Sequence, residues 1–201
     1  MSSSSAENRK HQPNLILASS SKYREKLLNR LSIPFLKQSP DINEAPEDFE
    51  TPMNTALRLA RDKAKKIGLK YSSSFVIGCD QLVERSGKTL HKPMTKPRAR
   101  RQLAWISGKT VSIFTGICLF NSGKKTFQSD VIKSSIEFRH LSKIEIENYL
   151  SLEMALDCAG GVKVEGLGIT LMKTIAGDDP TAIEGLPLIR LSNMLRQEGL
   201  I

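Results

Sequence analysis

Runs of apolar residues separated by polar turns predict a chain in which strands and helices alternate. Two short apolar runs, residues 15–18 and 75–78, have the length and composition of buried strands. Two longer runs, residues 110–120 and 127–138, flank the turn residues 121–123 and predict a long antiparallel pair. The expected fold is therefore α/β, with a mixed, partly antiparallel central sheet flanked by helices.

Shorter extended segments complete the expected sheet. Ser86-Gly87 lies between residues 82–85 and 88–91 and is a two-residue hairpin signal. Residues 33–36 and 169–175 also have the composition of strands.

Five segments have the spacing or the end signals of helices. The strongest begins at Ser142, where Ser142 and Glu145 form a capping-box pattern. Thr51-Pro52 marks the start of another, which Gly68 ends. The other three are expected at about residues 22–31, 97–106 and 187–198.

The composition is typical of a soluble globular protein. The chain has 201 residues, of which 39% are hydrophobic and 25% charged, enough for one core or one core divided into two lobes. Residues 1–13 are Ser-rich and polar and lack the apolar segment of a secretory signal. We expect a short disordered tail there, followed by a single α/β domain over residues 14–201.

Charge and cysteine content narrow the class of partner and the compartment. The formal charge of +9 favours anionic ligands such as nucleotides, nucleic acid or an acidic protein. Cys79, Cys118 and Cys158 are far apart and form no C-x-x-C pair, which suits a reducing compartment. No run approaches the roughly 18 apolar residues of a membrane span. We therefore expect a cytoplasmic protein with no membrane partner.

The segment that joins the first strand to the first helix has the residues of an anion site. Ser21 is the expected N-cap, and Lys22 and Arg24 follow in the first turn, where the helix dipole disfavours cations. An anion at the helix start would reverse that effect, because amides, hydroxyls and two cations would converge on one phosphate. A Ser-rich turn with two solvated bases is an equally good interpretation of this segment alone.

Several charged residues stand at the ends of apolar elements. Asp80 comes directly after a buried strand, so it should lie at a sheet edge that opens onto a crevice. Glu44 lies in an acidic loop, Lys92 is followed by a proline, and Glu165 lies in a glycine-rich segment. Lys63 falls within the apolar stripe of its helix, where it either extends to solvent or is directed into a cleft. Singly each is an ordinary surface charge, but together carboxylates and cations of this kind suit metal-assisted phosphoryl chemistry.

These motifs resemble those of the Maf-type nucleoside-triphosphate pyrophosphatase family. Residues 15–24 are similar to its opening signature, roughly L-x-L-A-S-x-S-P-x-R, although Lys22 replaces the proline. Residues 76–81 with Gly87 and Lys92-Pro93 are similar to the G-[AS]-D-x and G-K-P elements. The similarity extends over nearly the whole chain and implies a two-lobed Maf/ITPase-like fold with a cleft.

Within the family, the chain is most similar to the 7-methyl-GTP pyrophosphatase branch. Gln81 follows the acidic residue, Tyr23 precedes the arginine, and Glu165 supplies the acid of the K-x-E-G element. The resemblance implies that these three select the base. Gly161-Val162 departs from the usual small-aromatic pair near Glu165.

The resemblance also implies roles for the charged residues. Asp80 is expected to be the catalytic proton acceptor, and Glu44 and Asp80 to hold a divalent cation, Mg²⁺ or Mn²⁺. The expected phosphate-binding residues are Ser19, Ser21, Arg24, Lys63 and Lys92.

The expected activity is hydrolysis of 7-methyl-GTP between the α and β phosphates, giving 7-methyl-GMP and pyrophosphate. One alternative is a dTTP/UTP pyrophosphatase of the same family. Another is a non-catalytic nucleic-acid-binding or septum-regulating protein, but the bases are dispersed and aromatics make up only 5% of the chain, few for a stacking platform. A nucleotide is therefore the expected partner, nucleic acid is disfavoured, and a homodimer is a further expectation.

Overall fold

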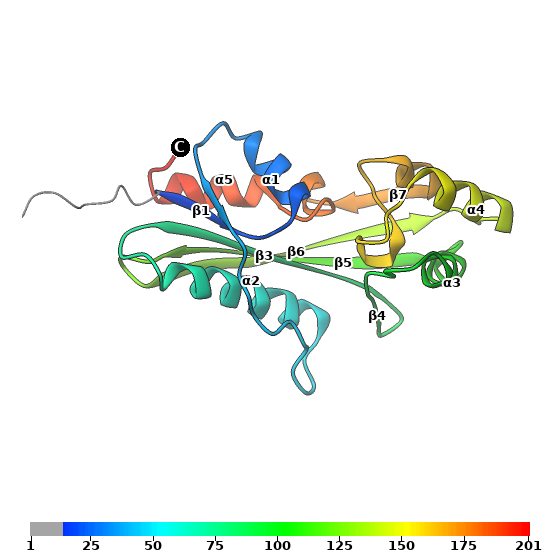
Figure 1. The fold of residues 1–201 in the computed structure, drawn as a ribbon, viewed down its shortest axis with the longest axis horizontal. Helices are drawn as coiled ribbons and strands as arrows, with labels where there is room; N and C mark the ends of the chain where they lie inside the picture. Colours follow the sequence, from blue (N-terminus) through cyan, green and yellow to red (C-terminus); the bar gives the residue numbers. More distant parts are fainter. Residues whose placement is uncertain (1–13) are drawn as a thin grey trace, which may run out of the picture.

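The computed structural model describes residues 14–201, which form a mixed seven-stranded sheet with helices on both faces (Figure 1). The disordered tail predicted at residues 1–13 lies outside the described residues. The strands are β1 (Leu15–Ala18), β2 (Leu36–Gln38), β3 (Phe75–Arg85), β4 (Lys88–Leu90), β5 (Thr110–Asn121), β6 (Thr126–Phe138) and β7 (Met172–Gly177). Their order is β2-β1-β3-β5-β6-β7, with β4 paired to β3.

The α-helices begin at the side chains that the sequence indicated. Ser21, Thr51 and Ser142 each accept a hydrogen bond from the backbone three residues on, and Ser142 forms the complete capping box with Glu145. The helices are α1 (Lys22–Asn29), α2 (Pro52–Gly68), α3 (Lys96–Ile106), α4 (Lys143–Leu152) and α5 (Leu188–Gln197). Three short 3₁₀ turns are η1 (Ala159–Gly161), η2 (Leu167–Leu171) and η3 (Pro180–Ala182). No helix among residues 14–201 is long and apolar enough to cross a membrane.

The sheet confirms the expected mixture of parallel and antiparallel pairing. β1 pairs in parallel with β2 and β3, whereas β3, β5, β6 and β7 pair antiparallel with one another in turn. The parallel part ends where Ala18 pairs with Gly78, but β3 continues. A crevice therefore opens beyond the carboxyl end of β1.

Three boundaries predicted from the sequence are wrong. β3 does not end before Asp80, because its ladder with β5 continues and pairs Asp80 with Gly116. β2 begins at Leu36, since Ile33 and the residues after it pack on the core before the chain joins the ladder. β7 begins at Met172 because the residues before it form the η2 turn.

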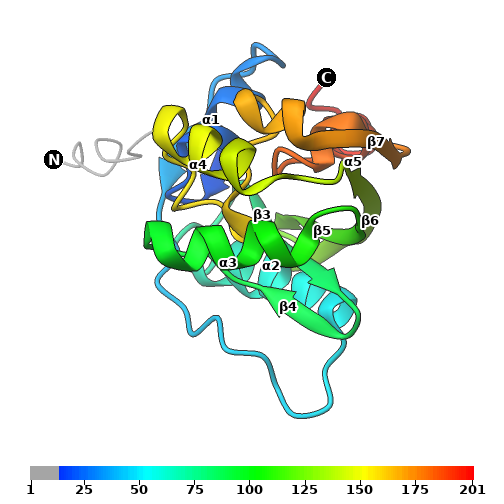
Figure 2. The same ribbon diagram turned by 90° about the vertical axis from the view of Figure 1, so that its right-hand side faces the viewer.

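The apolar residues form three clusters that divide the molecule into two lobes. In the first lobe, α1 and α5 cover one face of the sheet and α2 covers the other (Figure 1). In the second lobe, α3 and α4 pack together on the other end of the long strands β3, β5 and β6 (Figure 2). β3 crosses from one lobe to the other, so its middle residues lie between them. The mixed sheet with helices on both faces agrees with the expected fold class.

Candidate active site

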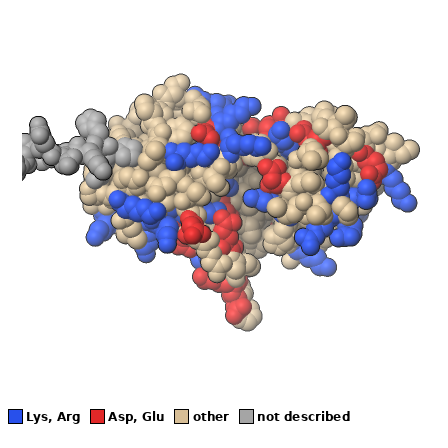
Figure 3. Space-filling view, in the orientation of Figure 1, with Lys and Arg blue, Asp and Glu red and all other residues tan. Residues whose placement is uncertain are grey.

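A cavity of about 890 Å³ lies between the two lobes. The space-filling view shows this hollow with acidic and basic side chains gathered around it (Figure 3). All ten candidate site residues from the sequence line the cavity. They are Ser19, Ser21, Tyr23, Arg24, Glu44, Lys63, Asp80, Gln81, Lys92 and Glu165.

A buried lysine joins two carboxylates at one end of the cavity. The Nζ atom of Lys63 lies 2.5 Å from Oδ1 of Asp80 and 2.6 Å from Oε1 of Glu44. Lys63 is only 5% exposed, so of its two expected positions the structure has the one directed into the cleft. Asp80 is 8% exposed and faces the cavity from the middle of β3.

Small residues let α2 approach the sheet closely enough for Lys63 to reach Asp80. A Cβ atom on Gly78 would lie 2.0 Å from the carbonyl oxygen of Ala60, and one on Gly116 would lie 2.2 Å from that of Ala56. Only glycine allows this separation of helix and strands. The buried alanines Ala56 and Ala60 on α2 therefore help to set the position of a charged side chain.

The carboxylates have the composition of a site for a hard divalent cation. Magnesium in proteins is usually bound through one or two carboxylates together with substrate phosphates and water. Among residues 14–201, no group of three or more potential ligands gathers for a metal, so Glu44 and Asp80 fit only this shared type of coordination. Burial acts to raise the pKa of Glu44, but the hydrogen bond from Lys63 and the surrounding positive charges hold that pKa below its ordinary value.

The turn between β1 and α1 forms a polar wall beside this pair. Ser19 is 4% exposed, and its Oγ accepts a hydrogen bond from the amide of Ser21 at 3.1 Å. Arg24 donates through Nε to the carbonyl oxygen of Gly185 at 2.9 Å and through Nη1 to Ser19 Oγ at 3.5 Å. The alternative of two solvated bases is thus wrong for Arg24, whereas Lys22 is exposed.

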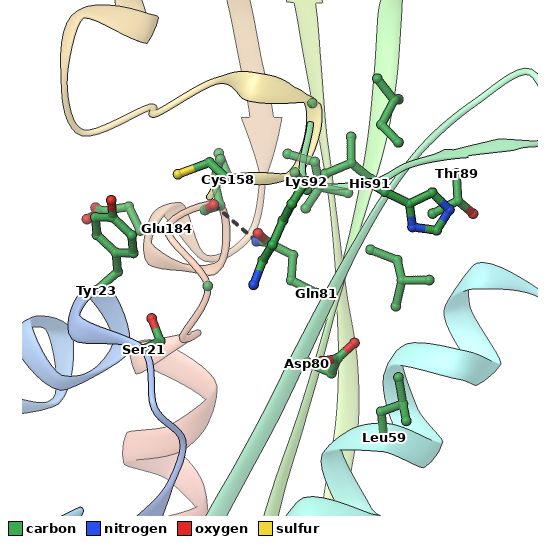
Figure 4. A pocket seen from close by; sticks show the side chains of 18 of the residues that line it. Ser21, Tyr23, Leu59, Asp80, Gln81, Thr89, His91, Lys92, Cys158 and Glu184 are labelled. Atoms are coloured by element: carbon green, nitrogen blue, oxygen red, sulfur yellow. Dashed lines mark hydrogen bonds between the residues drawn. The ribbon is translucent and has the colours of Figure 1, made fainter. Parts of the chain in front are cut away.

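Tyr23 lies at the other end of the cavity, where the charge of Glu165 acts on its phenol, whereas Gln81 lies between this end and Asp80 (Figure 4). Tyr23 is half-buried on α1, and Glu165 is exposed on the loop before η2. Gln81 is held by the protein itself, because its Nε2 donates to the carbonyl oxygens of Ala182 at 2.8 Å and Ile183 at 3.0 Å. Gln81 therefore fixes the position of the segment that follows η3.

Three further residues around Tyr23 were missed by the sequence reasoning. Asp157, Cys158 and Glu184 all line the cavity, and Figure 4 shows Tyr23, Cys158 and Glu184 close together. Burial, then the charges of Cys158 and Asp157, raise the pKa of Tyr23, which keeps its phenol protonated. Burial and then the charge of Glu165 raise the pKa of Glu184. Their position in the sequence could have indicated them, since Asp157 and Cys158 lie just before Gly160 and Glu184 lies just before Gly185.

Comparison with known proteins gives the class of this protein. A family model described as Maf-like protein matches residues 14–198, and the chain belongs to the Maf family. It is 46% identical over 187 residues to a 7-methyl-GTP pyrophosphatase of Methylobacillus flagellatus, covering 93% of this chain and 97% of that protein. It is 48% identical over 185 residues to a 7-methyl-GTP pyrophosphatase of Nitrosospira multiformis, covering 92% and 93% respectively.

A solved structure is more distantly similar. A HAM1 protein from Coxiella burnetii aligns over 80% of this chain and 98% of its own, with 18% identity and a TM-score of 0.38. A similarity of that size carries no argument about the site.

Proposed function

We propose that the protein is a nucleoside-triphosphate pyrophosphatase that hydrolyses 7-methyl-GTP to 7-methyl-GMP and pyrophosphate. The observation that carries the proposal is the Glu44–Lys63–Asp80 cluster at one end of a cavity whose other end holds Tyr23 and Glu165. The printed names of two relatives, 46% and 48% identical over almost the whole chain, support the substrate. The three free cysteines support action in the cytoplasm.

Asp80 accepts the proton of the attacking water. The water oxygen bonds to the α phosphorus, the bond from that phosphorus to the oxygen bridging to the β phosphate breaks, and pyrophosphate leaves with the electron pair. Lys63 donates to Oδ1 of Asp80 and so fixes the direction of the carboxylate. A carboxylate that faces the cavity can accept a hydrogen bond from a water bound there, as a general base must.

The cations of the cavity bind the triphosphate. Arg24, Lys63 and Lys92 line the cavity, and the charges of all three act on Glu44 beside Asp80. There they offset the charge that develops on the phosphate oxygens. A Mg²⁺ or Mn²⁺ ion held by Glu44 and Asp80 would supply further charge neutralisation there. Because these side chains bind the triphosphate, which all nucleoside triphosphates share, they act in the same way on every substrate.

The opposite end of the cavity reads the base. A methylated, cationic guanine stacks on the ring of Tyr23, and Glu165 accepts a hydrogen bond from the N–H edge of the base. Gln81 contributes by holding the backbone of Ala182 and Ile183 against this end.

The test is pyrophosphate release from a panel of 7-methyl-GTP, GTP, UTP and dTTP, with and without Mg²⁺ or Mn²⁺. We expect turnover to need the metal and kcat/KM to be largest for 7-methyl-GTP. A preference for UTP and dTTP would favour the alternative activity of the same family. Release of inorganic phosphate without pyrophosphate would contradict the proposed bond cleavage.

A further inference from the structure

The base end of the cavity is acidic, although the protein carries a formal charge of +9. Three carboxylates line this end, those of Asp157, Glu165 and Glu184. The charges of Asp157 and Glu165 both act on the phenol of Tyr23, and that of Glu165 acts on Glu184. The three carboxylates therefore surround one aromatic ring from two loops that are far apart in the sequence.

Carboxylates gathered in this way repel one another. Burial and the neighbouring Glu165 raise the pKa of Glu184, and the opposing charges of Arg30 and Lys26 do not cancel this effect. A positive charge brought among them would relieve the repulsion. The acidic end thus favours a cationic group independently of any hydrogen bond that the group makes.

The ring of Tyr23 already has cations near it. The Nζ atoms of Lys22 and Lys163 lie 5.2 Å and 5.8 Å from its centroid, within the range of cation–π attraction. Lys163 also pairs with Glu153 at 3.2 Å, so it keeps a partner when a ligand replaces it at the ring. The named substrate of the two relatives, 7-methyl-GTP, carries a positive charge on its methylated base.

We propose that this end of the cavity selects positive charge on the base, and that Asp157 and Glu184 are specificity-determining residues that act with Glu165 through their charge. The inference rests on the proposed function and deepens it. The substrate class is then nucleoside triphosphates with cationic, alkylated bases, including 1-methyladenine and 3-methylcytosine as well as 7-methylguanine. A charge acts over several ångströms without exact register, and the cavity of about 890 Å³ is large enough for purines and pyrimidines.

The test compares each cationic nucleotide with its neutral parent. We expect kcat/KM for 3-methyl-CTP to exceed that for CTP, and kcat/KM for 7-methyl-GTP to exceed that for GTP. In Glu184→Gln and Asp157→Asn we expect each preference to fall by about three- to tenfold, the effect of one unit charge several ångströms away near a protein surface. High salt should reduce the preference of the wild type in the same direction.

Asp178→Asn is the matched control. Asp178 is exposed, lies in the segment that leads to Glu184, and does not line the cavity, yet its loss changes the net charge by the same amount. We expect this variant to keep the wild-type preference. Asp157 is itself exposed, so its variant should fold even if Glu184→Gln does not.

Binding separates this inference from the proposed function. Isothermal titration calorimetry with 7-methyl-GMP, GMP, 3-methyl-CMP and CMP measures the preference for charge without hydrolysis. If the wild type prefers the cationic monophosphates but releases no pyrophosphate, the activity is wrong and the inference stands. Equal affinity for 3-methyl-CMP and CMP, or equal losses for charged and neutral ligands in Glu184→Gln and Asp157→Asn, overturns the inference while leaving the pyrophosphatase intact.

Discussion

The two ends of the cavity are built differently. At the phosphate end, where Asp80 lies, three side chains are buried. Ser19 lies in the turn directly after β1, Lys63 on α2 and Asp80 on β3. At the base end, Tyr23 is half-buried on the first turn of α1, and Glu165 is exposed on an irregular loop. Three residues of the proposed catalytic and phosphate-binding set are therefore buried beside the sheet, although Glu44 lies in a loop. The proposed base-reading residue Glu165 lies on a segment that can change without disturbing the sheet.

The loop at the base end is held by a few specific bonds. The amide of Lys163 donates to the hydroxyl of Tyr149 at 3.1 Å, and the amide of Leu167 donates to Oε2 of Glu153 at 2.7 Å. Both acceptors belong to α4 or to the residue after it. Under the proposed function, base specificity would depend on how the second lobe holds this loop, whereas bond cleavage would depend on the first lobe and β3.

The largest effect is expected from Asp80→Asn. The amide keeps the volume of the carboxylate but cannot accept the proton of water, so kcat should fall by about 10²–10⁴-fold for every nucleotide. Pyrophosphate release measures this, and thermal unfolding checks the fold. Asp62→Asn, on the exposed side of α2, is the control and should keep full activity. A variant of Asp80 within a few-fold of wild type would remove the general base from the mechanism.

Glu165 and Arg24 should separate the two ends of the cavity. Glu165→Gln should lower kcat/KM for 7-methyl-GTP about ten- to a hundredfold relative to UTP, the loss of a hydrogen bond to a charged group. Tyr23→Ala should act in the same direction through lost stacking. Arg24→Ala and Lys92→Ala should lower all substrates by similar factors and keep their ranking. Equal losses for every nucleotide in the Glu165 and Tyr23 variants would show that these residues do not read the base.

The close approach of α2 to β3 should be required for stability and for turnover, because it places Lys63 beside Asp80. Gly78→Ala would place a Cβ atom 2.0 Å from the carbonyl oxygen of Ala60, so we expect about 1–3 kcal/mol of destabilisation. The displacement of Lys63 should lower kcat/KM for every nucleotide about equally. Gly123→Ala is the matched control, since the nearest atoms to its Cβ are 3.5 Å away. Denaturant unfolding and turnover measure both effects, and an unchanged Gly78→Ala protein would refute the packing argument.

The smallest effect concerns Lys22, whose family counterpart is proline. Lys22 is the first residue of α1, a position that accepts proline, and its Nζ lies 5.2 Å from the ring of Tyr23. Lys22→Pro should remove a competing cation and lower KM for 7-methyl-GTP by about two- to threefold, while KM for UTP stays the same. Lys26→Ala, later in α1, tests whether any loss of positive charge has this effect. A rise in KM for both nucleotides would assign Lys22 to the phosphate end instead.

The sequence by itself determined the features that depend on neighbouring residues. Ser142 caps its helix with Glu145, three positions away. The turn that joins β3 to β4 consists of Ser86 and Gly87, both of which have positive φ. Such signals are local because capping, turn formation and amphipathic spacing each involve only a few successive residues.

Only the tertiary structure decided which charged groups meet. Arg24 donates to a carbonyl 161 residues away, and Lys63 is buried only because Gly78 lets its helix approach β3. The continuation of β3 through Asp80 required the partner strand β5. Glu184 came to the ring of Tyr23 in the same way, from the other end of the chain. The physical reason is that a charge is placed by the packing of the element that carries it, and this packing depends on residues distant in the sequence.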